Sequence, residues 1–227
     1  MGRELTELSY EGWVNWVFDH PVTEPPWHFE GDADWWDEER DPAATAGYLA
    51  RLFEEPERLL EQFTPAQINV GLWFLASVSC SNHMFALLDE AVPWAARKRA
   101  IEAMAVLYEK LFAPVCTEFY GHLGAGPEKP NPVNSICYMW WDLCPVTPYA
   151  PSPSDPERDA VVLDVLQRIL RLPSPACREA ALRGLGRSQA RYPTRTQQII
   201  DELLAREPAL PAELQAYALA ARVGAVG

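Results

Sequence analysis

The feature of this sequence that most constrains its fold is a proline placed directly after a small polar residue. The pair recurs at the start of four runs whose apolar residues have helical spacing: Asp41-Pro42, Thr64-Pro65, Asp155-Pro156 and Ser174-Pro175. A small polar side chain caps the first N–H groups of a helix. Proline is tolerated at the first helical position, because the N–H that it lacks would be unbonded there. The four pairs therefore predict four helix starts.

The rest of the sequence extends this pattern to a chain of short helices joined by rigid turns. Proline is abundant, with 21 residues, whereas glycine contributes only 12. No segment alternates apolar and polar residues in the manner of a strand. We predict an all-α fold of about 11 short helices, at residues 9–19, 42–54, 56–63, 65–79, 82–91, 94–113, 133–143, 156–172, 175–190, 195–206 and 211–223.

The last third of the sequence contains an internal repeat. Residues 162–166 align with 199–203 at an offset of 37, and the helix start at Pro175 aligns with Pro211 at an offset of 36. A helix, a short turn and a second helix, repeated at this length, resemble a HEAT-like α-solenoid, whose units have about 40 residues. The resemblance covers 156–225 and implies stacked helical hairpins.

We predict that the chain forms a single all-α domain. Its parts are an acidic N-terminal segment, central helices and HEAT-like repeats, at residues 1–63, 64–144 and 156–225. Two further segments, Tyr-Met-Trp-Trp-Asp at 138–142 and Ala-Leu-Arg-Gly-Leu-Gly at 181–186, also resemble an uncharacterised bacterial family of helical proteins. That resemblance assigns no catalytic residue.

The negative charge of the sequence is concentrated near its N-terminus. Residues 1–63 hold 16 Asp and Glu against four Arg, a net charge of −12 out of −13 for the whole chain. The acids between residues 30 and 41 are as dense as in a calcium loop but lack its ligand order and final glutamate. We expect a solvated loop, or a docking surface for a basic partner. A phosphate backbone attracts cations, so no nucleic-acid partner is expected there.

Composition also indicates in which compartment the protein resides and whether it holds a cofactor. No apolar run reaches the about 18 residues that span a bilayer, and no secretory signal is recognisable. We therefore expect a cytoplasmic protein without a membrane partner. The odd number of cysteines and the lack of a Cys-x-x-Cys pair predict free thiols. Cys80 and His83 form an isolated pair, so we expect a half-buried histidine there and no metal site or cofactor.

Residues 131–145 concentrate two cysteines, three aromatic residues and one carboxylate between proline-rich loops. On a helix, Tyr138 and Asp142 share one face, and the apolar side chains share another. We expect the apolar face to plug the core between the central helices and the repeats. An aspartate beside two tryptophans is costly to bury alone, so either an arginine pairs with Asp142 or Asp142 lines a groove. The candidate binding residues are Tyr138, Trp140, Trp141 and Asp142.

A second candidate surface is basic. Arg183, Arg187 and Arg191 recur every four residues, a spacing that puts them on one helix face, at the end of and just beyond the helix predicted at 175–190. The simplest interpretation is a solvated face. The alternatives are a binding surface for an acidic partner and a contact with the acidic N-terminal segment of the same chain.

These patterns leave three function classes open. The leading hypothesis is a non-enzymatic helical-repeat module that binds a protein partner. The second is a helical enzyme with a pocket near Trp140, Trp141 and Asp142, although no nucleophile or phosphate-loop signature is present and no catalytic residue is assigned. The third is an acidic inhibitor or immunity-type protein that imitates nucleic acid through residues 24–41. The sequence does not determine the oligomeric state.

Overall fold

Among the residues that the structure describes, the regular elements are all helical apart from one short strand pair. We describe a computed structural model over residues 3–4, 8–29, 36–37, 41–124, 126, 130–149 and 154–226. The strands β1 (Arg3–Glu4) and β2 (Trp36–Asp37) pair in parallel, with Arg3 opposite Trp36. The α-helices are α1 (Tyr10–Phe18), α2 (Pro42–Glu54), α3 (Glu57–Gln62), α4 (Pro65–Ala76), α5 (Trp94–Leu107), α6 (Ala113–Val115), α7 (Val133–Leu143), α8 (Pro156–Ile169), α9 (Pro175–Ser188), α10 (Pro193–Arg206) and α11 (Ala212–Arg222).

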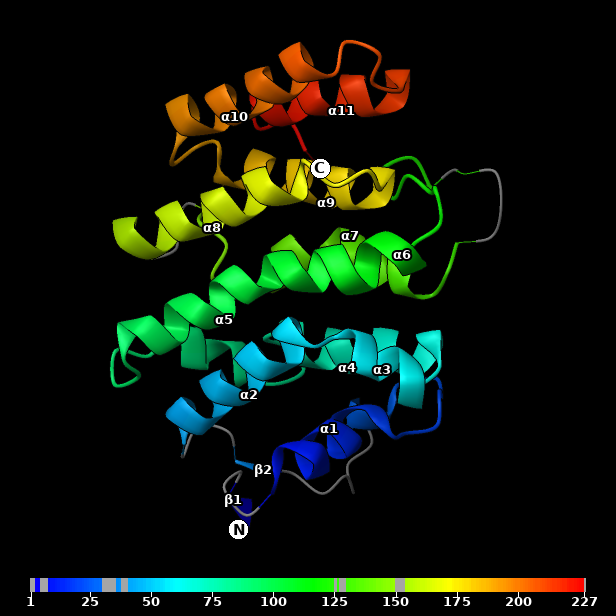
Figure 1. The fold of residues 1–227 in the computed structure, drawn as a ribbon, viewed down its shortest axis with the longest axis vertical. Helices are drawn as coiled ribbons and strands as arrows, with labels where there is room; N and C mark the ends of the chain where they lie inside the picture. The colour runs from blue at the N-terminus through cyan, green and yellow to red at the C-terminus, as the bar shows by residue number, and fades with distance from the viewer. Residues whose placement is uncertain are drawn as a thin grey trace.

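The helices stack in antiparallel pairs along the long axis of the molecule (Figure 1). One row consists of α2, α5, α8 and α10, and the second of α4, α7, α9 and α11. Within the second row, α7 packs between α4 and α9, and α9 packs against α11. The N-terminus lies at one end of the stack beside α1, and α10 and α11 close the other end (Figure 1). The all-α fold of helical hairpins agrees with the prediction, whereas the HEAT-like identity stays a prediction.

The four predicted helix starts are confirmed. The side chains of Asp41, Thr64, Asp155 and Ser174 each accept a hydrogen bond from a backbone N–H in the first turn of the following helix. Thr64 and Gln67 also form a capping box, in which each side chain accepts a hydrogen bond from the backbone N–H of the other residue. The predicted bounds of 42–54 and 133–143 agree with α2 and α7 at both ends. Local capping chemistry therefore determined where these helices begin.

Two predicted helices differ from the structure. The helix expected at 82–91 is only a 3-10 helix, η3 (His83–Leu87), followed by turns. The helix expected at 94–113 is α-helical only to Leu107 and continues as a π-helical turn, η4 (Tyr108–Phe112), before α6. Pro114 follows this turn and cannot donate the next α-helical hydrogen bond. The wider turn therefore lies where the regular bonding pattern ends.

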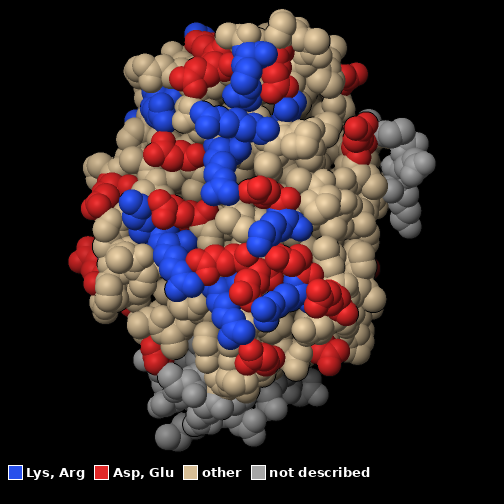
Figure 2. All heavy atoms as spheres, in the orientation of Figure 1, with Lys and Arg blue, Asp and Glu red and all other residues tan. Residues whose placement is uncertain are grey.

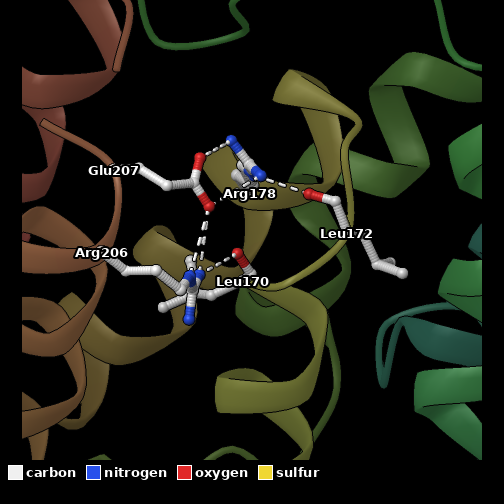
Figure 3. Close-up of polar contacts among 5 residues, drawn as sticks. All are labelled: Leu170, Leu172, Arg178, Arg206 and Glu207. Carbon is white, nitrogen blue, oxygen red and sulfur yellow. Dashed lines mark hydrogen bonds and ion pairs between the residues drawn. The ribbon is translucent and has the colours of Figure 1, made fainter. Parts of the chain in front are cut away.

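The two hairpins aligned in the sequence also meet at equivalent turns (Figure 3). Arg178 of α9 donates to both carboxylate oxygens of Glu207, at 2.6 and 3.0 Å, and to the carbonyl of Leu172. Arg206 donates to the carbonyl of Leu170 at 3.2 Å. These bonds join the turn after α8 to the turn after α10, which are the corresponding turns of the two predicted repeats.

The buried apolar side chains form one continuous cluster from Trp13 to Val226. The apolar face of α7 lies inside it, as the sequence predicted: Cys137, Trp140, Trp141 and Cys144 are all buried. Gly184 of α9 makes this packing possible, since a Cβ there would lie 2.9 Å from Cγ of Trp141. Helix α4 is buried on most sides, although Val78, just beyond its end, is exposed.

Candidate functional site

The structure separates the seven predicted binding residues into two groups. Trp140 and Trp141 are fully buried in the core. Neither ring lines the two cavities described below, whereas Asp142 lines one of them, so the pocket predicted near these three residues stays a prediction. The other five residues form polar contacts between neighbouring helices.

Asp142 is paired with arginine and also lines a groove described below, so the structure shows both of the alternatives that the sequence left open. Arg183 Nε donates to Asp142 Oδ2 at 2.6 Å, and Arg183 Nη1 donates to the hydroxyl of Tyr138 at 2.5 Å. Arg187 Nε lies 3.3 Å from Asp142 Oδ1. The guanidinium of Arg183 also covers the ring of Tyr138, 4.6 Å from its centroid. These contacts bring four of the predicted residues into one cluster between α7 and α9.

The expectation of a solvated arginine stripe is wrong for Arg183 and Arg191, which are both largely buried. Arg191 lies 3.7 Å from Asp159, a fully buried carboxylate that also accepts hydrogen bonds from Arg158 and Tyr192. The carboxylates facing the stripe therefore come from α7 and α8. The contact with the acidic N-terminal segment, which the sequence left open as an alternative, is not seen in the described residues. The N-terminus lies at the far end of the stack from α9 and α11 (Figure 1).

Apart from the backbone of Trp36–Asp37, the acidic run at residues 30–40 lies outside the described residues, so the structure says nothing of a docking or nucleic-acid-like surface there. The face shown in Figure 2 carries interleaved acidic and basic side chains, with no continuous acidic stripe on its described part. Ion pairs link neighbouring elements of the stack: Arg99–Glu54, Lys110–Glu57, Arg168–Glu109 and Arg195–Asp164. Such exposed pairs are typical of a solvated surface.

A cavity of about 410 Å³ lies between α7, α9 and the loop that connects α6 to α7. Its apolar lining includes Phe119, Met139 and Ala176. Tyr138, predicted as a binding residue, and Glu179 of α9 also line it. Glu179 is only 1% exposed. We refer to this space as the Glu179 cavity.

The carboxylate of Glu179 holds the α6–α7 loop in place. Its Oε2 accepts from the backbone N–H of Gly121 at 2.9 Å. Its Oε1 accepts from the backbone N–H of His122 at 3.0 Å and from His122 Nδ1 at 2.5 Å. Because an ionised carboxylate can only accept, His122 Nδ1 is the donor in this contact. The ring of His122 stacks on Tyr217 of α11, with centroids 4.1 Å apart.

Sequence reasoning missed Glu179, His122 and Gly121 as site residues. The nearest signal was the loop at 121–132, which is rich in glycine and proline. At Gly121 this composition has a geometric cause, since a Cβ would lie 2.7 Å from the ring of Tyr138. The missing side chain lets the loop backbone approach α7 closely enough to reach Glu179.

A larger groove of about 770 Å³ lies where α4 and α7 end and α5 and α8 begin. Three of its apolar side chains, Val78, Phe85 and Tyr149, are 46%, 43% and 38% exposed. Charged side chains of both signs also line it, among them Asp142 and Arg97. We call it the Phe85 groove. Exposed apolar side chains gathered in one concave surface are typical of an interaction site.

The surroundings of His83, in the isolated Cys80–His83 pair, are those of a buried side chain in the core. His83 is fully buried rather than half-buried, and its Nε2 accepts from Trp13 Nε1 at 3.1 Å. Within the described residues, no three His, Cys, Asp or Glu side chains gather as metal ligands. In the same part of the chain no helix is long and apolar enough to cross a bilayer.

Comparison of the chain with protein-family models, with curated proteins and with solved structures finds no match. The Phe85 groove and the Glu179 cavity are the two features of the structure that suggest a function.

Proposed function

We propose that this chain is a non-enzymatic interaction module that binds a protein partner in the Phe85 groove. The observation that carries the proposal is the exposure of Val78, Phe85 and Tyr149 in one concave surface. A cluster of this kind loses contact with water when a partner covers it, which favours association. The proposed occupant is an apolar segment of a basic protein.

The charge distribution supports this choice of occupant. The groove has apolar side chains flanked by Arg97, Glu90 and Asp155, an arrangement that resembles the apolar centre and polar rim of protein interfaces. The chain as a whole carries a net charge of −13. The electrostatic field of a negatively charged protein accelerates its encounter with a basic partner more than it strengthens the final contact. The proposal places the module in the cytoplasm, where its thiols stay reduced.

The test uses photo-crosslinking from inside the groove. A photoreactive phenylalanine analogue replaces Tyr149 in one tagged full-length variant and Leu219 in a control. Leu219 is also exposed but lies on α11 and does not line the groove. We expect a crosslinked protein from the Tyr149 position only. Adding Phe85→Asp should remove that product, while the melting temperature stays near that of the parent because the Phe85 side chain is already half-exposed.

Two outcomes would contradict the proposal. One is equal crosslinking from Tyr149 and Leu219, which would indicate nonspecific contact. The other is a product that persists with Phe85→Asp in a folded protein. If the crosslinked product were instead a small metabolite, the enzyme alternative with a pocket near Asp142 would gain support, because Asp142 lines this groove.

A further inference from the structure

The Glu179 cavity contains a buried carboxylate whose hydrogen bonds to protein do not use its full acceptor capacity. A carboxylate has about four lone-pair positions. Three donors reach Glu179: the N–H of Gly121 at Oε2, and the N–H and Nδ1 of His122 at Oε1. One acceptor position at Oε2 is therefore open to a further donor. Because Glu179 lines the cavity, this donor can come from a ligand inside it.

The formal charge on the described residues that line the cavity is negative only. Among the described residues that line it, Glu179 alone carries a formal charge, and the other polar groups are Asn69, Asn131, Asn134, Ser135 and Tyr138. A buried carboxylate in an apolar cavity attracts a cation more strongly than an exposed one, since little water screens it.

The shape of the cavity limits the ligand further. A volume of about 410 Å³ falls in the range of small-molecule sites. Phe119, Met139 and Ala176 provide apolar contacts for a stem. Ser135 and Asn69 also line the cavity, and Ser135 Oγ donates to Asn69 Oδ1 at 2.8 Å. The ligand that fits both features is a short apolar body with one cationic end.

We propose that the Glu179 cavity binds a small organic cation, an ammonium or guanidinium group on an apolar stem, with Glu179 Oε2 as its acceptor. This site is separate from the Phe85 groove and does not depend on the proposed function. The cation donates to Oε2 while its stem contacts Phe119 and Met139. The α6–α7 loop forms one wall, held by the bonds that Gly121 and His122 make to the same carboxylate.

Three probes with related stems test the charge preference in the full-length chain by calorimetric titration. They are phenethylammonium, the neutral 2-phenylethanol and the anionic phenylacetate. We expect saturable binding of phenethylammonium at least about tenfold tighter than that of the alcohol, the ratio for about 1.4 kcal/mol, and no binding of phenylacetate. Equal binding of ammonium and alcohol, or no saturable binding of the ammonium, would overturn the proposal.

Two variants locate the binding. Glu179→Gln removes the charge and should reduce the affinity for phenethylammonium to that for the alcohol, whereas Glu213→Gln, on the exposed start of α11, should leave it unchanged. Because Glu179→Gln also perturbs the loop, Ala176→Leu provides an independent test: it keeps the carboxylate and fills the cavity. Unchanged binding in Ala176→Leu would contradict the assignment. A lysine peptide with blocked ends, binding more tightly than the free amine, would also overturn it by assigning the site to a protein side chain.

Discussion

Asp142 on α7 and Arg183 on α9, 41 residues apart in the sequence, form an ion pair that joins two neighbouring helical hairpins. Arg183 Nη2 lies 2.5 Å from Asp142 Oδ2, and the two side chains are only 9% and 11% exposed. Removing Arg183 would leave the buried carboxylate of Asp142 only the longer and more exposed contact with Arg187, so most of the compensation for its charge would be lost.

Arg183→Met should therefore lower the free energy of unfolding by about 3 kcal/mol. The matched control is Arg195→Met, whose pair with Asp164 has side chains that are 40% and 69% exposed. That change should cost less than about 1 kcal/mol. Urea unfolding followed by circular dichroism measures both. Equal losses in the two variants would show that burial does not determine the importance of the Asp142 pair.

The buried imidazole of His83 makes stability depend on pH. Burial lowers its pKa from the ordinary value of 6.5 to about 3. Between these values the unfolded chain binds a proton that the folded chain excludes, so stability is complete above about pH 6.5 and is lost as the pH falls toward 3. From pH 7 to pH 5.5 this one group should remove about 1 kcal/mol.

His83→Gln should lose less stability than the wild type between these two pH values, because the variant has no group to protonate at this position. The comparison is made between the two proteins because burial also lowers the pKa of His28. The free energy of unfolding at each pH gives the result. An identical loss in both proteins would mean that His83 is accessible to protons in the folded state.

Two helical glycines should respond to alanine in opposite directions. At Gly184 a Cβ would lie 2.7 Å from Leu166 Cδ2, in a packed core. Gly184→Ala should destabilise the fold by about 1–3 kcal/mol despite the higher helix propensity of alanine. At Gly47, on the exposed side of α2, a Cβ meets nothing within 4 Å. Gly47→Ala should stabilise by up to about 1 kcal/mol. Thermal unfolding of the two variants tests whether close helix packing is the reason why residue 184 is a glycine.

The five cysteines should divide into two reactivity classes. All are free thiols; Cys80 and Cys116 are partly exposed, and Cys137, Cys144 and Cys177 are buried. Burial raises the pKa of Cys144 to about 12, so little thiolate forms at neutral pH. A chromogenic disulfide reagent should modify two thiols in the folded protein and five after unfolding. Rapid modification of more than two, or a native intramolecular disulfide found by mass spectrometry, would contradict this assignment.

What the sequence alone determined is local. A capping side chain and the N–H groups it binds are three residues apart or fewer, so Thr64 and Asp155 identified their helices from neighbouring positions alone. The 37-residue repeat likewise predicted the hairpins that meet through Arg178 and Glu207. One helix that the sequence predicted wrongly is that at 82–91, where the segment forms only a short 3-10 helix, η3, against α2 and α5.

The tertiary structure alone decided which charges meet. The sequence indicated that Asp142 needs an arginine, but only the packing of α7 against α9 selected Arg183 from among the others. Glu179 and His122 are 57 residues apart, and no local pattern links them. Their contact depends on how closely the loop backbone at Gly121 can approach Tyr138 once the hairpins have stacked. Helix boundaries arise from bonds between near neighbours in the chain, whereas both candidate sites lie between elements that come together only in the folded stack.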